Sequence, residues 1–220
     1  MPRIVYKAAD GKRVPSVSTI LSQLGWSKDG LVYWANSVGL DGMTLDEARE
    51  RVTGPGTIAH AMIEADTKGE ALDTSKVAND VLTEARQSFD NYLAWKAANV
   101  VEVLSSEGSL VSEELRFGGT HDLVYIGRSG KVCMLDAKTG NGVYGDHMVQ
   151  VAGYGMLWNE NEGPAKQRFV DRYEVLRVHK DNAAQSWHSV SAESMGAPTE
   201  AFKLARRLYD LQKPIKKLVS

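Results

Sequence analysis

Cysteine is almost absent from this sequence of 220 residues, which contains only Cys133. One thiol cannot form an internal disulfide, and it cannot supply a multi-cysteine zinc site or iron–sulfur cluster. The chain also lacks any apolar run of the roughly 18 residues that a membrane-spanning helix needs. Its first residues lack the apolar segment of a signal peptide. We therefore expect a cytoplasmic protein that makes no membrane contact.

The chain as a whole also lacks the excess of basic residues that many nucleic-acid-binding proteins carry. It holds 26 Lys and Arg against 28 Asp and Glu. The balance is uneven, because residues 161–220 hold 11 Lys and Arg against 7 Asp and Glu. This basic segment either approaches phosphates, through Lys203, Arg206, Arg207 and Lys213, or forms the solvated face of a helix. Charge alone leaves both interpretations open.

The apolar pattern indicates a single domain, residues 1–220, with a helical N-terminal portion (about 15–98) and a sheet-containing core (about 99–220). The expected helices are a short one around Ile20, one around Trp34, one that begins near Gly56, and others over 76–98, 144–159 and 198–213. The expected strands are 100–106, 109–117, 120–127, 131–138, 172–180 and 185–191. This order of helices and strands predicts a mixed α/β fold.

Two of the expected strands, 120–127 and 131–138, flank a short turn at residues 128–130. If this turn is a three-residue hairpin loop with its glycine in the left-handed conformation, Asp122 lies directly opposite Asp136. Opposed residues of an antiparallel pair have Cβ atoms roughly 4.5–5.5 Å apart. The loop therefore predicts two neighbouring carboxylates.

Lys138 shares a face of its strand with Asp136, because side chains alternate along a strand. Adjacent carboxylates repel each other, and a bound Mg²⁺ ion, which takes oxygen ligands, offsets that repulsion. A lysine beside the metal can orient a water or neutralise a phosphate. The alternative is that these charges lie on a solvated strand face. Apolar residues on both faces, among them Met134 and Leu135, instead predict a buried central strand, where such charges favour a metal site.

Four motifs in the chain stand in the order found in PD-(D/E)XK nucleases of the RecB-like branch. They are GTIAHAMIE at 56–64, GGTHD at 118–122, LDAK at 135–138 and QVAGY at 150–154. The segments PSVSTIL and LVYWANSVG also resemble small phage-type and mitochondrial-type exonucleases. Since one cysteine cannot hold the iron–sulfur cluster of several RecB-like nucleases, the resemblance is to the cluster-free exonucleases. It implies a restriction-endonuclease-like fold, with a central mixed sheet flanked by helices.

The resemblance implies a role for each matching residue. Asp122 and Asp136 would ligate Mg²⁺ or Mn²⁺, and the carbonyl of Ala137 would add an oxygen. Lys138 would stabilise or orient the attacking hydroxide. His60 would be a further ligand or would position the metal-bound water.

Three more residues are implied around this centre. Glu64, one turn after His60, would reach a second metal or hold a water. Gln150 and Tyr154, four residues apart on one helix face, would line the site and touch the nucleic-acid backbone. Without the motifs, His60 would be an ordinary helix histidine and Tyr154 a core side chain. The five tryptophans are interpreted as core or surface packing residues rather than base-stacking platforms.

The implied function is metal-dependent hydrolysis of phosphodiester bonds in DNA. An exonuclease is favoured over an endonuclease, acting in recombination or repair of phage or bacterial DNA beside phage or host recombination proteins. The alternatives are a catalytically weak or inactive DNA-binding module on the same fold, a structure-specific endonuclease, and a metal-dependent enzyme for small phosphorylated molecules. The presence of both Asp136 and Lys138 disfavours the first, and the absence of a Gly-rich phosphate loop disfavours the last.

Overall fold

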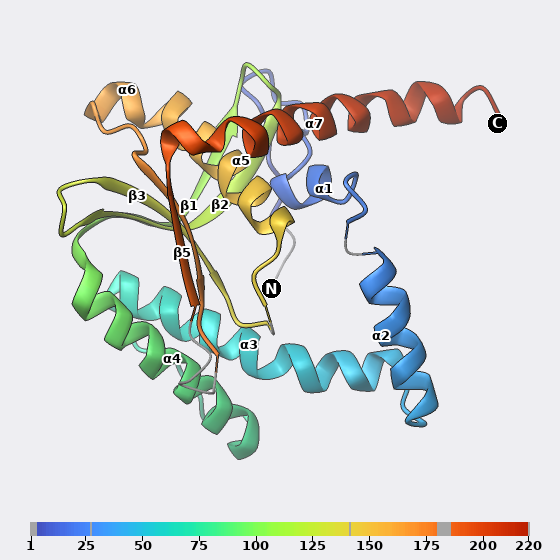
Figure 1. Ribbon diagram of the computed structural model, residues 1–220, viewed down its shortest axis with the longest axis vertical. Helices are drawn as coiled ribbons and strands as arrows, with labels where there is room; N and C mark the ends of the chain where they lie inside the picture. Colours follow the sequence, from blue (N-terminus) through green and yellow to red (C-terminus); the bar gives the residue numbers. More distant parts are fainter. Residues whose placement is uncertain (1–3, 27, 141, 180–185, 220) are drawn as a thin grey trace.

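The computed structural model describes residues 4–26, 28–140, 142–179 and 186–219 (Figure 1). The helices that precede the sheet are α1 (Val17–Leu21), α2 (Lys28–Leu40), α3 (Leu45–Lys68) and α4 (Asn79–Asn99). The strands are β1 (Val100–Ser112), β2 (Phe117–Gly127), β3 (Val132–Lys138), β4 (Arg172–Arg177) and β5 (Ser186–Ser191). The later helices are α5 (Gly145–Asn161), α6 (Gly163–Lys166), the short 3₁₀ helix η2 (Ala192–Met195) and α7 (Gly196–Lys216).

The five strands form one sheet in the order β1-β2-β3-β4-β5. The β3–β4 pair is parallel and the other three pairs are antiparallel. α5 lies in the connection between β3 and β4, which supplies the crossover that a parallel pair requires. The predicted mixed α/β fold, with a central mixed sheet flanked by helices, is confirmed. None of the described helices is long and apolar enough to cross a membrane.

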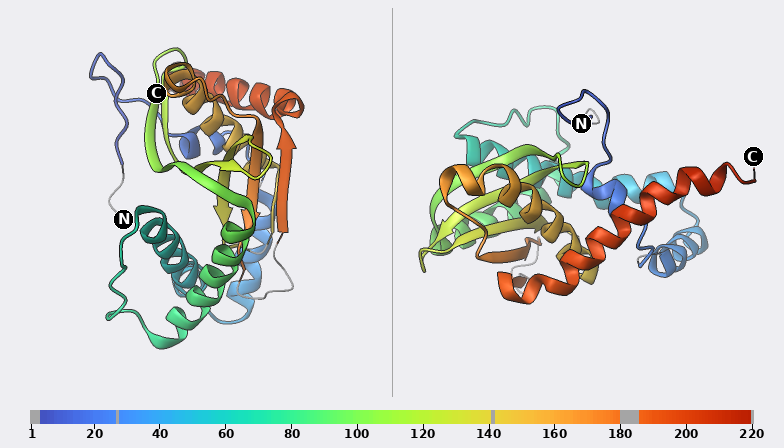
Figure 2. Two further views of the ribbon diagram at one scale, coloured as in Figure 1. Left: turned by 90° about the vertical axis from the view of Figure 1, so that its left-hand side faces the viewer. Right: turned by 90° about the horizontal axis from the view of Figure 1, so that it is seen from above.

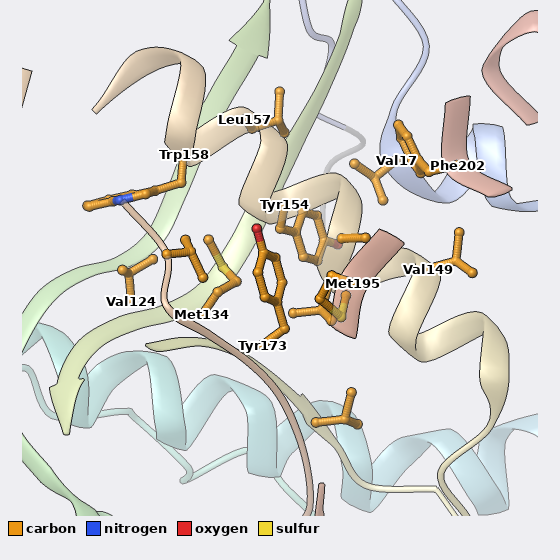
Figure 3. Close-up of a cluster of buried hydrophobic side chains, with 14 of the residues drawn as sticks. Val17, Val124, Met134, Val149, Tyr154, Leu157, Trp158, Tyr173, Met195 and Phe202 are labelled. Carbon is orange, nitrogen blue, oxygen red and sulfur yellow. The ribbon is translucent and has the colours of Figure 1, made fainter. Parts of the chain in front are cut away.

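Helices cover both faces of the sheet (Figures 1 and 2). On the face of α1, α5 and α7, Met134 of β3 packs in one apolar cluster with Trp158 of α5 (Figure 3). On the face of α3 and α4, Leu135 packs in a second cluster with Trp95 of α4. Alternate residues of β3 thus enter opposite clusters, so β3 is buried on both faces, as its sequence predicts.

The β2–β3 hairpin has the predicted three-residue loop. The Gly127 N–H donates to the Lys131 carbonyl at 3.0 Å, and the Gly130 N–H donates to the Gly127 carbonyl at 2.9 Å. Gly130 has a φ of 74°, in the left-handed region that glycine adopts most readily. The predicted register of the two strands is confirmed. Continued past the last ladder pair, it brings Asp122 level with Asp136.

α3 is longer than the sequence analysis indicated. The predicted helix start near Gly56 is wrong, because α3 begins at Leu45. Thr44 caps the helix: its hydroxyl accepts from the Glu47 N–H at 3.3 Å, and its own N–H donates to the Glu47 carboxylate at 2.9 Å. This capping box fixes the start. The helix continues through Pro55 at the loss of one backbone hydrogen bond.

β1 is one strand where two were predicted. The expected separate strands over 100–106 and 109–117 are wrong, because the chain remains paired with β2 from Val100 to Ser112. Glu107 adopts a left-handed φ of 48° within the strand, and pairing continues on both sides of it. The chain turns later, at residues 113–116. Residues 180 and 185, predicted as strand ends, lie outside the described residues.

Arg206 of α7 has a packing role rather than an exposed one. It is buried, and its guanidinium donates to the carbonyls of Leu115 at 2.9 Å and Arg116 at 3.0 Å. It also forms an ion pair with Asp210. Arg206 therefore fastens α7 to the turn between β1 and β2, and the interpretation of this side chain as a phosphate contact is not supported.

Replacing Gly130 with alanine tests the hairpin loop. Because a side chain disfavours the left-handed conformation, Gly130→Ala should lower the free energy of unfolding by about 1–2 kcal/mol in urea denaturation. Nothing lies within 4 Å of a Cβ added at Gly130 or at Gly140, but only Gly130 has a positive φ. Gly140→Ala is therefore the matched control and should lose far less. Equal losses would contradict this account of the loop.

Candidate active site

Asp136 is a buried acid on the central strand β3, with 1% of its surface exposed. Val132 and Met134 precede it on the same face, in the apolar cluster under α5. The Nζ atom of Lys138 lies 2.6 Å from Asp136 Oδ2. Burial raises the pKa of Asp136 to about 6, because Lys138 only partly opposes the effect and the charge of Asp122 adds to it. Ionising this carboxyl is therefore costly, and a further cation would offset that cost.

Asp122 lies where β2 and β3 separate. The ladder between the strands ends at the pair Leu123–Leu135, and beyond it the Ala137 N–H donates to Asp122 Oδ2 at 2.7 Å. Burial raises the pKa of Asp122, while Lys138 and the hydrogen bond from Ala137 lower it. An ionised carboxylate has about four acceptor positions, so one hydrogen bond leaves capacity for a metal ion.

A hydrogen-bonded chain connects Lys138 with α5. Lys138 Nζ donates to Gln150 Oε1 at 3.0 Å, and Gln150 Nε2 donates to the Tyr154 hydroxyl at 2.9 Å. Because an ammonium group can only donate, the amide oxygen of Gln150 must face Lys138. Tyr154 is buried in the cluster shown in Figure 3, and burial raises its pKa. The structure thus brings these three sequence-predicted residues together.

α3 carries His60 towards the same place. Gly56, one turn earlier, allows the close approach, because a Cβ there would lie 2.5 Å from Oγ1 of Thr139, just past the end of β3. Burial lowers the pKa of His60, the charge of Lys138 lowers it further, and Asp136 opposes both. The ring is therefore within electrostatic range of both charged groups. It is neutral at pH 7, the state in which imidazole can accept a hydrogen bond.

Glu64 is positioned differently from the other predicted residues. Its carboxylate forms an ion pair with the Lys68 ammonium, four residues later on α3. Its charge nevertheless contributes to the raised pKa of Glu107. Glu64 therefore lies at the edge of the group. Its carboxylate is already paired with Lys68, so the structure does not support the implied contact with a second metal.

Glu107 of β1 is an acidic residue of this group that sequence reasoning missed. Burial raises its pKa to about 7, Asp122 and Glu64 raise it further, and Lys68 lowers it. Its left-handed backbone is uncommon for a residue with a side chain, and such conformations concentrate at functional sites. The Glu107-Gly108 pair has the composition of a turn, so the sequence predicted a break between two strands here rather than a site residue. Glu107 can be recognised as part of the site from the register of β1 on β2, which brings it level with Asp122.

The donor set of the group fits a hydrated hard cation. Among the described residues, no three His, Cys, Asp or Glu side chains form a complete metal-binding group. Mg²⁺ does not need one, because it commonly binds through one or two carboxylates and keeps several waters. Asp122 and Asp136 supply such a pair, and the carbonyl of Ala137 is a candidate third oxygen. Structural Zn²⁺, with four protein ligands, fits less well.

Comparison with known proteins identifies no family. No protein-family model and no curated protein sequence matches the chain. The alkaline exonuclease LHK-Exo from Laribacter hongkongensis is 10% identical with a TM-score of 0.35, over 76% of this chain and 92% of that one. The protein SSO0001 is 13% identical with a TM-score of 0.30, over 70% of this chain and 74% of that one. Likeness at this level establishes neither fold nor function, which must be inferred from the residues themselves.

Calorimetry with Mn²⁺ tests the separate roles of Asp136 and Lys138. Asp136→Ala removes a ligand and should weaken Mn²⁺ binding by more than the roughly 10–100-fold that loss of an outer-shell partner causes. Lys138→Ala should bind Mn²⁺ nearly normally, because an ammonium supplies no lone pair. Asp80→Ala, at an exposed position on α4, is the control and should bind normally. Equal losses for the Asp136 and Lys138 variants would contradict the two roles.

Proposed function

We propose that this chain is a Mg²⁺- or Mn²⁺-dependent deoxyribonuclease of the PD-(D/E)XK type, folded as one domain over residues 1–220. The observation that carries the proposal is the meeting of two carboxylates, the buried Asp136 and the half-buried Asp122, with the ammonium group of Lys138. Charged groups are rarely placed on a buried central strand for packing alone. Together they supply what metal-assisted phosphodiester hydrolysis requires, which is a cation site and a positive donor beside it.

Asp122, Asp136 and the carbonyl of Ala137 would hold the metal ion, which lowers the pKa of a bound water and stabilises charge on the phosphate. Lys138 is placed to donate a hydrogen bond to the attacking water or to a phosphate oxygen. Gln150 fixes the direction of that ammonium group by accepting from it. A fixed donor needs no reorganisation when charge develops, which is why its position matters for rate.

The residues around this centre have supporting roles. Neutral His60 can accept a hydrogen bond from the attacking water, and Tyr154 holds Gln150 in place. The order of the four sequence motifs favours the RecB-like branch and an exonuclease over an endonuclease. The proposed setting is recombination or repair of phage or bacterial DNA, with phage or host recombination proteins as partners.

Digestion of end-labelled single- and double-stranded DNA tests the proposal. We expect cleavage with Mg²⁺ or Mn²⁺ and none with EDTA. Products that shorten progressively from an end identify an exonuclease, whereas fragments of intermediate length identify an endonuclease. Binding to DNA without cleavage under every metal condition would contradict the enzyme assignment and leave a DNA-binding module.

Conservative variants test whether the cleavage comes from this site. Asp136→Asn and Lys138→Met keep the size of each side chain but remove its charge, and each should reduce the cleavage rate by at least about 10²–10³-fold. Circular dichroism should show an unchanged fold for both. Asp80→Asn should cleave at the parental rate. Parental rates for the Asp136 and Lys138 variants would place the chemistry elsewhere.

A further inference from the structure

A concavity of about 570 Å³ lies between α2 and the start of α5. We call it the aromatic pocket, and its walls include Trp26, Leu31, Trp34, Tyr144 and Asp146. The volume lies within the roughly 300–1,000 Å³ that is typical of small-ligand sites. Its lining is mainly aromatic and aliphatic, which is the lining of a site for a flat, uncharged group.

Two of the three aromatic side chains that line this pocket are largely exposed. Trp26 and Tyr144 expose 58% and 61% of their surface. Clustered apolar exposure of this kind indicates a binding surface, since isolated exposed side chains are common but an aromatic concavity is not. Trp26 is therefore not a core residue, and its exposed ring is available to a ligand.

One wall of the aromatic pocket, Tyr144, contacts His147 in the first turn of α5. The Tyr144 ring meets the His147 ring edge-on, with centroids 5.5 Å apart, and the Tyr144 N–H donates to His147 Nδ1 at 3.2 Å. His147 is also close enough to Lys138 for that charge to lower its pKa, after the larger effect of burial. Gln150, which holds Lys138, follows His147 by about one helical turn. A ligand in contact with Tyr144 would therefore lie at the start of α5, the helix whose Gln150 accepts a hydrogen bond from Lys138.

The negative charge of the pocket favours the base of a nucleotide over its phosphate. Among the described residues that line it, the one charged side chain is Asp146, and one carboxylate oxygen of Asp146 is buried without a hydrogen-bond partner in the described structure. A negative group repels phosphate, whereas nucleobases present amino or imino donors and two flat faces. Aromatic side chains bind single-stranded nucleic acid by stacking on such faces.

We propose that the aromatic pocket binds one unpaired base of a single-stranded DNA end, stacked on Trp26 and its neighbours, next to the phosphate held at Lys138. This inference rests on the proposed nuclease function and adds to it the class of substrate. A base can enter the pocket only when it is unpaired, so the site selects single-stranded or frayed ends.

Binding is measured without catalysis, in EDTA, by anisotropy with a short labelled single-stranded oligodeoxynucleotide and with an abasic strand of equal length. Wild-type protein should bind the base-bearing strand more tightly. Trp26→Ala and Tyr144→Ala should each weaken that binding about tenfold, with no effect on the abasic strand, because stacking depends on the base. Trp26→Phe should restore most of the affinity. Trp187→Ala, a partly exposed tryptophan on β5, is the matched control and should bind normally.

The outcomes separate this inference from the proposed function. If binding depends on the base and on Trp26 but the protein never cleaves DNA, the proposed role of the pocket would stand and the nuclease assignment would be wrong. If the protein cleaves DNA but binds the base-bearing and abasic strands equally, with or without Trp26, only the proposed role of the pocket would be wrong. A change of oligomeric state in Trp26→Ala, seen by sedimentation velocity with unchanged oligonucleotide binding, would show that a second copy covers the pocket and would also overturn the inference.

Discussion

The carboxylate of Asp136 imposes the main constraint on the site, because it carries a charge on a strand that is buried on both faces. Removing a carboxylate from water penalises its ionised form. Lys138 offsets part of that penalty from 2.6 Å away, yet the pKa of Asp136 remains raised to about 6. Asp122, which is half-buried, adds a second negative charge nearby, and desolvation raises its pKa as well. A divalent cation between the two acids would relieve both effects at once.

The position of Lys138 depends in turn on the packing of α5. Gln150 accepts a hydrogen bond from the ammonium group and donates one to Tyr154, which is held in the apolar cluster of Figure 3. Apolar packing on that face of the sheet thus fixes the direction of a charged donor. On the other face, the absence of a side chain at Gly56 lets α3 approach the end of β3, which brings His60 within range. The two helical layers therefore contribute different parts of one site.

Those parts of the structure that follow from local geometry could be predicted from sequence. The loop at residues 128–130 sets the register of β2 and β3, and alternation along β3 places Lys138 beside Asp136. Glu107 escaped prediction because local composition indicated a turn, whereas pairing with the next strand, β2, continues on both sides of its left-handed backbone. α3 begins at Leu45 rather than near Gly56, because the Thr44 capping box fixes its start and the helix continues through Pro55. In both cases a longer-range or competing interaction decided the structure.

Anomalous diffraction from a crystal soaked in Mn²⁺ tests the central claim most directly. The account predicts a peak between Asp122 and Asp136, with carboxylate oxygens at close to the roughly 2.0–2.1 Å that octahedral Mg²⁺ takes, and waters in the remaining positions. Lys138 Nζ should remain within hydrogen-bond distance of Gln150 and turn towards one of those waters. A fully occupied Mn²⁺ site elsewhere, with Asp122 and Asp136 free of metal, would contradict the account.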